Sequence, residues 1–226
     1  MAIDDVRAML ASVHEYNVNL MTREIYLHGF YASGDGDVNE PGVEYRMANG
    51  FIKNLNFLNQ LNHNDIVIHQ HTVGGIWNSG MSIFDSLKNS VSKTIMIVYA
   101  QASSMSSITL QGASLRLLMP NTEFLVHDGT FGAEGTPTQV TSALRYCERT
   151  RKVGVQIYAE RCINGEYFKK KKMNIKEVSK FIQNKILRNT DWYMDAREAI
   201  SYGFADGIIG EDGYTISFKS APKKRK

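Results

Sequence analysis

Cysteine and long apolar runs are both scarce in this sequence, and each scarcity excludes a class of protein. Only two of the 226 residues are cysteine. Cys147 and Cys162 show no CxxC spacing and no partner histidines, so we expect free thiols in a reducing compartment and exclude a disulfide-built fold. No apolar run approaches the ~20 residues that span a bilayer, and residues 1–5 are acidic where a secretory signal would be basic. These absences predict a soluble cytoplasmic protein that does not enter a membrane.

Signature motifs for nucleotides and metals are also missing. Without a GxxxxGK[ST] phosphate loop, the chain is not expected to hydrolyse ATP. Residues 33–42 form an acidic, glycine-rich stretch, but it lacks the ligand spacing of a calcium loop. His69 and His71 have the i, i+2 spacing of a metal-binding pair, yet no third ligand is in view, which favours a structural role. We therefore expect no metal and no cofactor.

The charge distribution argues against nucleic acid as a partner. Two lysine-rich runs, residues 169–172 and 223–226, carry eight positive charges, and without them the net charge of +3 becomes −5. An acidic body does not attract phosphates. With 43% hydrophobic and 22% charged residues, the chain has the composition of one globular domain with a substantial core.

Apolar periodicity predicts an α/β fold with a mainly parallel sheet. Short β-branched runs alternate with segments in which apolar residues recur every three or four positions, which is typical of strands joined by helical crossovers. The predicted strands are residues 24–28, 65–69, 95–99, 115–120 and 122–127. The predicted helices are residues 1–20, 45–61, 78–89, 138–163, 175–187 and 196–202. The long pattern at 138–163 is expected to project from the core as an arm.

The turn after strand 95–99 is the first candidate for catalysis. The apolar run breaks at Gln101 into small and hydroxyl residues and resumes as a helix. Such a strand-to-helix turn holds one side chain rigid and exposed, and the amides of the helix N-terminus favour developing negative charge. A serine there is a candidate nucleophile. A plain polar turn or a helix cap has the same composition, so this alternative stays open.

Three residue types in separate segments supply the roles of a serine hydrolase. Ser103 or Ser104 is the candidate nucleophile, His127 the general base, and Asp191 the carboxylate that orients the imidazole. The Gly-x-Ser-x-Gly elbow of α/β-hydrolases is missing. Taken singly, His127 also fits a hydrogen-bonded core histidine, and Asp191 also fits a cap of the turn before Trp192.

The segments around these residues resemble those of the Clp protease proteolytic subunit (ClpP) family of self-compartmentalising serine peptidases. The matching segments are residues 74–85, 100–106, 120–127 and 191–206. In that order they are similar to the family's Gly-Gly turn and following helix, its Gly-Gln-Ala-Ala-Ser-Met-Gly nucleophile turn, its Leu-Pro-Asn-Ser…His strand, and the segment that begins with its catalytic aspartate. The likeness extends over residues 23–209.

The resemblance implies a role for individual residues. Ser104 precedes a methionine, as the family's serine does, and becomes the nucleophile, with His127 as base and Asp191 as its carboxylate. Gly75 and Met105 match the positions whose backbone amides form the family's oxyanion hole. Elementary chemistry agrees, because glycine lets a backbone approach closely and Met105 begins a helix.

The resemblance also implies a fold and an assembly. The fold is the ClpP/crotonase-like α/β arrangement of repeated ββα units with the arm at residues 138–163. Residues 1–22 become an N-terminal segment, residues 23–210 the protease domain, and residues 211–226 a basic tail. The expected assembly is a homo-oligomer of heptameric rings stacked in pairs, which cleaves unfolded polypeptides delivered by an AAA+ unfoldase.

Several positions depart from the family pattern. Ala100 and Ser106 replace glycines and Val73 replaces a proline. Asp128 adds a carboxylate directly after the base, and it would raise the pKa of the imidazole if it approached the ring. The larger departures are Asn189 and Thr190 in place of a charged pair that couples rings, an insertion at residues 34–41, and an N-terminal segment unlike the family's axial-pore hairpin. These bear on ring coupling and unfoldase docking rather than on the triad.

Two further functions remain open. One is a non-catalytic ring or scaffold subunit, which peptidase activity of the pure protein would exclude. The other is a crotonase-type acyl-CoA enzyme, because that related fold also uses a glycine-rich oxyanion turn. Such chemistry does not need Ser104, His127 and Asp191, and binding of a CoA thioester would identify it.

Overall fold

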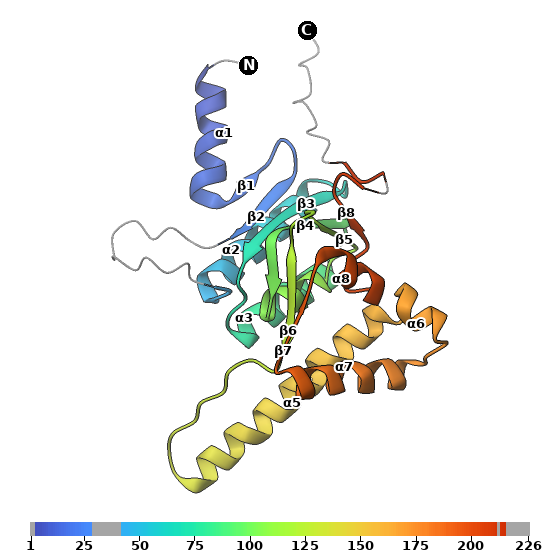
Figure 1. The fold of residues 1–226 in the computed structure, drawn as a ribbon. Coiled ribbons are helices and arrows are strands. Elements are labelled where there is room, and N and C mark those ends of the chain that lie inside the picture. The colour runs from blue at the N-terminus through green and yellow to red at the C-terminus, as the bar shows by residue number, and fades with distance from the viewer. Residues whose placement is uncertain (1–2, 29–41, 212, 216–226) are drawn as a thin grey trace.

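The computed structural model describes residues 3–28, 42–211 and 213–215, and Figure 1 shows their arrangement. The helices are α1 (Ile3–Tyr16), α2 (Tyr45–Leu61), α3 (Trp77–Lys88), α4 (Met105–Leu110), α5 (Pro137–Cys162), α6 (Glu166–Lys170), α7 (Ile175–Asn189) and α8 (Ala196–Tyr202). The strands are β1 (Val18–Asn19), β2 (Glu24–His28), β3 (Ile66–Thr72), β4 (Thr94–Ser103), β5 (Leu115–Leu118), β6 (Glu123–His127), β7 (Asp191–Met194) and β8 (Gly207–Ile208).

The strands form one mainly parallel sheet, as the sequence predicts. Its main order is β1-β2-β3-β4-β5-β8, with β6 paired to β4 and β7 paired to β6. The β1–β2 and β6–β7 pairs are antiparallel, and the other pairs are parallel. Strand β4 pairs with β3 along one edge and with two strands along the other, where residues 95–98 pair with β5 and residues 101–103 pair with β6.

Strand β4 continues to Ser103 and does not end at Tyr99, where the predicted strand ends. The chain bends there instead, because Ala100 has φ 58° and the register with β3 shifts between Gln70 and Thr72. The polar residues beyond the bend remain in a strand because β6 supplies a second set of backbone partners. A run of small and hydroxyl residues carries no local signal of that long-range pairing.

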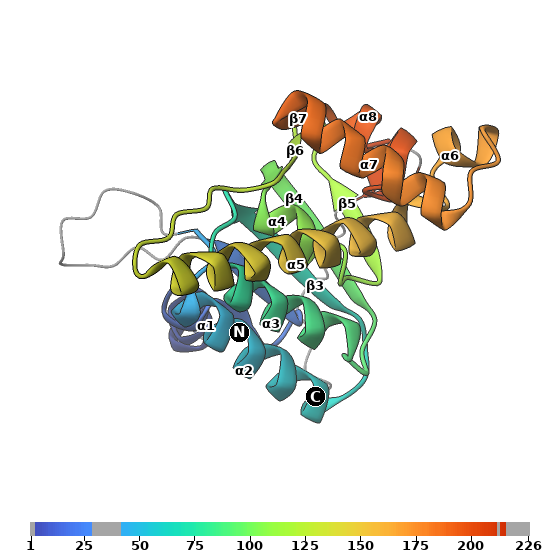
Figure 2. The same cartoon turned by 90° about the horizontal axis from the view of Figure 1, so that it is seen from below.

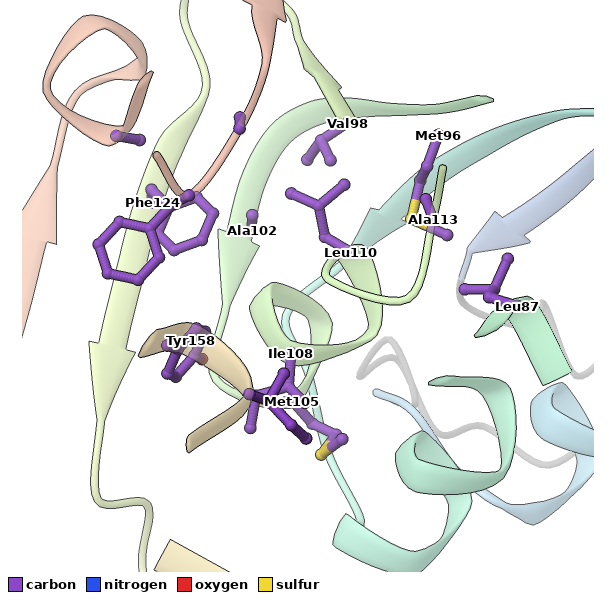
Figure 3. Packing of buried hydrophobic residues seen from close by; sticks show 14 of the residues in the cluster. Leu87, Met96, Val98, Ala102, Met105, Ile108, Leu110, Ala113, Phe124 and Tyr158 are labelled. Atoms are coloured by element: carbon purple, nitrogen blue, oxygen red, sulfur yellow. The ribbon is translucent and has the colours of Figure 1, made fainter. Parts of the chain in front are cut away.

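The two faces of the sheet are covered differently. Side chains alternate across a strand, and Ile66, Ile68, Met96 and Val98 join the main core with apolar residues of α2 and α3. On the other face, a smaller cluster is centred on Ile97, Leu117 and Ile209. Figure 2 shows α2 and α3 beneath the strands and α5 beside α7. In Figure 3, Met105, Ile108 and Leu110 extend from α4 into the main core.

Local signals predicted most helix limits well. Helix α2 matches its predicted range, and α8 has the Asp195–Glu198 capping box with Gly203 in the left-handed region after its last turn. The end of α6 falls in the lysine-rich run at residues 169–172, and helix α6 and strands β1, β7 and β8 were not predicted. The loop at residues 33–42 lies almost entirely outside the described residues, as does the basic tail from residue 216 onward.

Helix α5 forms the predicted arm. Its C-terminal half is buried against the core through residues such as Val155, Tyr158 and Ala159. Its N-terminal half, with the segment that leads into it, extends beyond the rest of the fold (Figure 1), and Leu144 there is 49% exposed. Both cysteines are free thiols: Cys147 lies part-way along α5, and burial raises the pKa of Cys162 at its end. None of the described helices combines the length and apolar character needed to cross a membrane.

The two histidines of β3 differ in environment. His69 Nδ1 is hydrogen-bonded to the Tyr99 hydroxyl at 2.9 Å, and its ring stacks on Tyr26. Its Nε2 is buried and has no partner in the described part of the chain. His71 is exposed. In the described part of the chain, no three His, Cys, Asp or Glu side chains gather as a metal site would require. His69 therefore acts as a packed aromatic side chain of the sheet.

Burial lowers the pKa of His69 below its ordinary 6.5, although the charge of Glu24 acts in the opposite direction. The unfolded chain then binds a proton at His69 more readily than the folded chain does. The stability that the neutral imidazole contributes is therefore complete above pH 6.5 and is lost as the pH falls through the folded pKa. We predict that His69→Gln flattens the fall in unfolding free energy between about pH 6.5 and 5, measured by urea denaturation. His71→Gln is the matched control and should leave the slope unchanged; equal slopes in wild type and His69→Gln would contradict the prediction.

Candidate active site

Ser104 stands at the junction of β4 and α4 in a strained backbone conformation. Its φ of 54° and ψ of −127° are unusual for a residue with a side chain, and such a conformation costs on the order of 1–3 kcal/mol. The Ser104 N–H donates to Leu125 O at 3.2 Å, which joins the turn to β6. The Ser104 side chain caps no amide of α4. The helix-cap alternative is therefore wrong for Ser104, and its hydroxyl remains free for another role.

The Gly74–Gly75 turn lies directly against this junction. Gly74 has φ 98°, and a Cβ added to it would lie 2.5 Å from Ser103 O and 2.8 Å from Met105 N. A Cβ on Gly75, at φ 153°, would lie 2.3 Å from Val43 O. Only glycine permits both approaches. The turn and the first amide of α4 are thus neighbours, and the Met105 N–H has no acceptor within its own helix because it begins that helix.

Strand pairing brings His127 and Asp191 together. In the antiparallel β6–β7 pair, His127 lies directly opposite Asp191. Its Nδ1 is 3.2 Å from Asp191 Oδ1, with the two side chains 21% and 45% exposed. The second ring nitrogen, Nε2, is buried and has no hydrogen-bond partner among the residues that the structure describes. The imidazole is therefore held from one side by a carboxylate and keeps its other nitrogen available.

The three predicted triad residues share one edge of the sheet. Ser104 follows the carboxyl end of β4, and His127 ends the parallel strand β6, whose Leu125 is paired with Ser103. Asp191 begins the antiparallel strand β7 at the same edge. No hydrogen bond joins Ser104 Oγ to His127 Nε2 among the described atoms. Such contacts are often long in ligand-free enzymes and tighten when substrate binds.

The extra carboxylate of Asp128 is paired with an arginine. Its Oδ2 lies 3.2 Å from Arg151 Nη1 on α5, and this hydrogen-bonded ion pair spans the space beside the base. The sequence left open whether Asp128 points toward the imidazole. In the structure its charge is shared with Arg151, a residue that motif reasoning did not single out because the two positions are far apart in the chain.

A cavity of about 500 Å³ opens beside Ser104 and His127, within the range of small-ligand and peptide pockets. Apolar and aromatic side chains from α3, α4, α5 and α7 form one part of its wall, and residues 127–131 form another. The wall residues include Trp77, Met105, Ile108, Cys147, Val155, Tyr158 and Ile186. Gly75 and Arg151 also border it, whereas Asp191 stands behind His127 and does not.

The α5 wall of this cavity was not predicted from the sequence. One signal was present: Gly154 interrupts a long helical pattern, and a glycine there lowers helix stability unless packing requires it. A Cβ on Gly154 would lie 3.4 Å from Ile108 and 3.6 Å from Trp77. Both are ordinary contact distances, so packing does not require glycine here, and the absent side chain leaves room at the cavity wall.

Comparison with known proteins identifies relatives for this arrangement. The sequence profile of the family described as Clp protease matches residues 38–212. The ATP-dependent Clp protease proteolytic subunit of Streptococcus uberis is 32% identical over 170 residues, which cover 74% of this chain and 80% of the relative. The protein of the same description from Ligilactobacillus salivarius is 30% identical over 177 residues, which cover 77% and 80%.

A solved structure supports the fold. A point mutant of ClpP1 from Listeria monocytogenes superposes with a TM-score of 0.67 at 18% sequence identity, and the match covers 84% of this chain and 92% of that one. The α/β arrangement of ββα units predicted above is therefore confirmed. Since the family profile spans most of the chain and the relatives match over about four fifths of their length, the chain belongs to the Clp protease family.

Proposed function

We propose that this protein is a serine endopeptidase in which Ser104, His127 and Asp191 form the catalytic triad. The observation that carries the proposal is the pairing of His127 with Asp191 across two strands, at the sheet edge where the strained Ser104 stands. An imidazole with Nδ1 near a carboxylate and with a buried Nε2 that has no partner among the described residues is arranged as a general base requires. Family membership supports the same reaction class.

The chemistry follows from these positions. Ser104 Oγ attacks the peptide carbonyl while His127 Nε2 takes its proton, and Asp191 stabilises the imidazolium that forms. The N–H groups of Gly75 and Met105 are proposed to stabilise the oxyanion, since both lie where the turn and the start of α4 meet. The base then returns the proton to the leaving amine. A water molecule hydrolyses the acyl-enzyme by the same steps in reverse order.

The substrate class is an extended peptide from an unfolded polypeptide. The cavity beside Ser104 is lined mainly by apolar and aromatic side chains, so it accepts an apolar side chain next to the scissile bond. The relatives are named as proteolytic subunits of an ATP-dependent protease. By analogy we propose that an AAA+ unfoldase delivers the substrate and that the proteolysis takes place in the cytoplasm.

We propose further that the subunits form heptameric rings stacked in pairs. Exposed apolar side chains on the arm, among them Val140, Leu144 and Val153, provide surface that a second subunit can bury. The apolar face of α1 is exposed as well, with Ile3 at 69% and Leu10 at 57%. Ring formation would enclose the active sites and restrict cleavage to unfolded chains.

Replacement of Ser104 tests the nucleophile. Wild-type protein should react with a fluorophosphonate probe and cleave a fluorogenic peptide, and Ser104→Ala should lose both activities because the attacking oxygen is gone. Ser103→Ala is the matched control in the neighbouring position and should retain both. Labelling of Ser104→Ala would contradict the assignment of Ser104 as the nucleophile. Assembled wild-type rings that neither label nor cleave would instead support the non-catalytic ring subunit.

Replacement of Gly75 tests the oxyanion site. The Cβ of Gly75→Ala would collide with Val43 O, so the turn must shift and its N–H must move. We predict a fall in kcat of roughly 10²–10³-fold, the effect typical of one lost oxyanion donor. Gly50→Ala is the control, because a Cβ there meets nothing within 4 Å. An unchanged kcat in folded Gly75→Ala would exclude this donor.

Light scattering tests the assembly. A heptamer of this 25.5 kDa chain has a mass of roughly 180 kDa and a stacked pair roughly twice that. We predict the larger mass for wild type and the smaller one for Leu144→Glu, because a charge on the arm opposes burial at a ring-to-ring contact. Leu144→Met preserves the apolar surface and should behave as wild type. A monomeric wild type would contradict compartmentalised proteolysis.

A further inference from the structure

Ser106, which stands where the family pattern has glycine, is fully buried and hydrogen-bonded to the chain just before the nucleophile. Its Oγ accepts from Ser103 N at 2.8 Å and donates to Ser103 O at 2.7 Å. Its own carbonyl accepts from Gln70 Nε2 and from Thr109 Oγ1, at 3.1 and 2.9 Å. Ser106 is therefore fixed to the central strand β3 and in turn holds the backbone N–H and C=O of Ser103.

The next serine makes the corresponding contact one residue later. Ser107 Oγ donates to Ser104 O at 2.6 Å and lies 2.6 Å from the Tyr158 hydroxyl on α5. Ser107 is buried, and Tyr158 lies in the wall of the active-site cavity. Two successive hydroxyls thus hold two successive carbonyls, those of Ser103 and Ser104.

These two carbonyls determine the conformation of Ser104. A peptide group is planar and trans, so its C=O and the following N–H point in opposite directions in one plane. Holding Ser103 O fixes the plane on the φ side of Ser104. Holding Ser104 O fixes the plane on its ψ side and thereby aims the N–H of Met105. A backbone at φ 54° and ψ −127° is not a local minimum for serine and persists only when its surroundings impose it.

We propose that Ser106 and Ser107 are positioning residues for catalysis: Ser106 holds the nucleophile in its strained conformation, and Ser107, with Tyr158, aims the Met105 N–H at the oxyanion. The inference rests on the proposed peptidase function. The hydroxyls touch neither substrate nor base and act only through the two peptide planes.

Kinetics of Ser106→Ala and Ser107→Ala test the proposal. We expect each substitution to lower kcat and the fluorophosphonate labelling rate together, by about ten- to a hundredfold. Small displacements of the reacting groups lower reaction rates by factors of this size. In Ser106→Ala, KM and the midpoint of the pH–rate profile should not change, since that substitution alters neither the cavity wall nor His127. Ser82→Ala is the matched control: Ser82 Oγ makes the same bond three residues back, to Ser79 O in α3, away from the nucleophile.

The outcomes separate this inference from the proposed function. Folded Ser106→Ala and Ser107→Ala with wild-type kcat and labelling rate would overturn the positioning role alone, as would an equal loss in Ser82→Ala. A wild type that never labels would overturn the peptidase function and the inference with it. If an alanine variant does not fold, the cysteine variant at that position tests the positioning role instead. Cysteine preserves the side-chain volume, but its thiol is a weak hydrogen-bond donor. The same fall in labelling rate is expected.

Discussion

Strand β6 is hydrogen-bonded along both edges, and the proposed active site depends on these two ladders. The parallel ladder with β4 pairs Ser103 with Leu125. Ser103 comes one residue before the proposed nucleophile, and Leu125 comes two residues before the proposed base. The antiparallel ladder with β7 sets His127 opposite Asp191. A slip of one residue in either ladder would turn the side chains to the opposite face of the sheet. The relative positions of the three residues therefore depend on the register of both ladders.

Strain at the site is balanced by hydrogen bonds that are themselves buried. Ser104 and Gly74 both have positive φ, and their backbones approach each other so closely that no Cβ fits on Gly74. Helix α4 follows directly after Ser104 and supports this turn, although the helix has only six residues. The cap residue after it, Gln111, donates to Ser107 O at 2.9 Å and accepts from Arg116 at 2.6 Å. A network of satisfied polar groups of this kind makes one conformation specific, because each group left unpaired inside the protein would be costly.

Several elements were predictable because their signals are local. Helix α2 follows from a 3.6-residue apolar period, and α8 from the capping-box pair Asp195 and Glu198 with Gly203 after it. The end of β4 was not predictable from composition, since Gln101 to Ser103 acquire strand geometry from pairing with β6 and, at Ala102, with β3. Strand β7 was missed for the same reason: four residues acquire strand geometry from pairing with β6.

The sequence alone determined the residue types of the candidate triad, the glycines of the neighbouring turn and the α/β succession, because these depend on side-chain chemistry and on periods of a few residues. Only the tertiary structure decided that Asp128 pairs with Arg151, that His127 keeps one nitrogen free, and that Ser106 holds the chain before Ser104. These contacts leave no local pattern in the sequence, because they join positions that are far apart along the chain or that have unusual backbone angles. Ser106 stands as the clearest case, since a serine in place of glycine is explained only by the atoms that its hydroxyl meets.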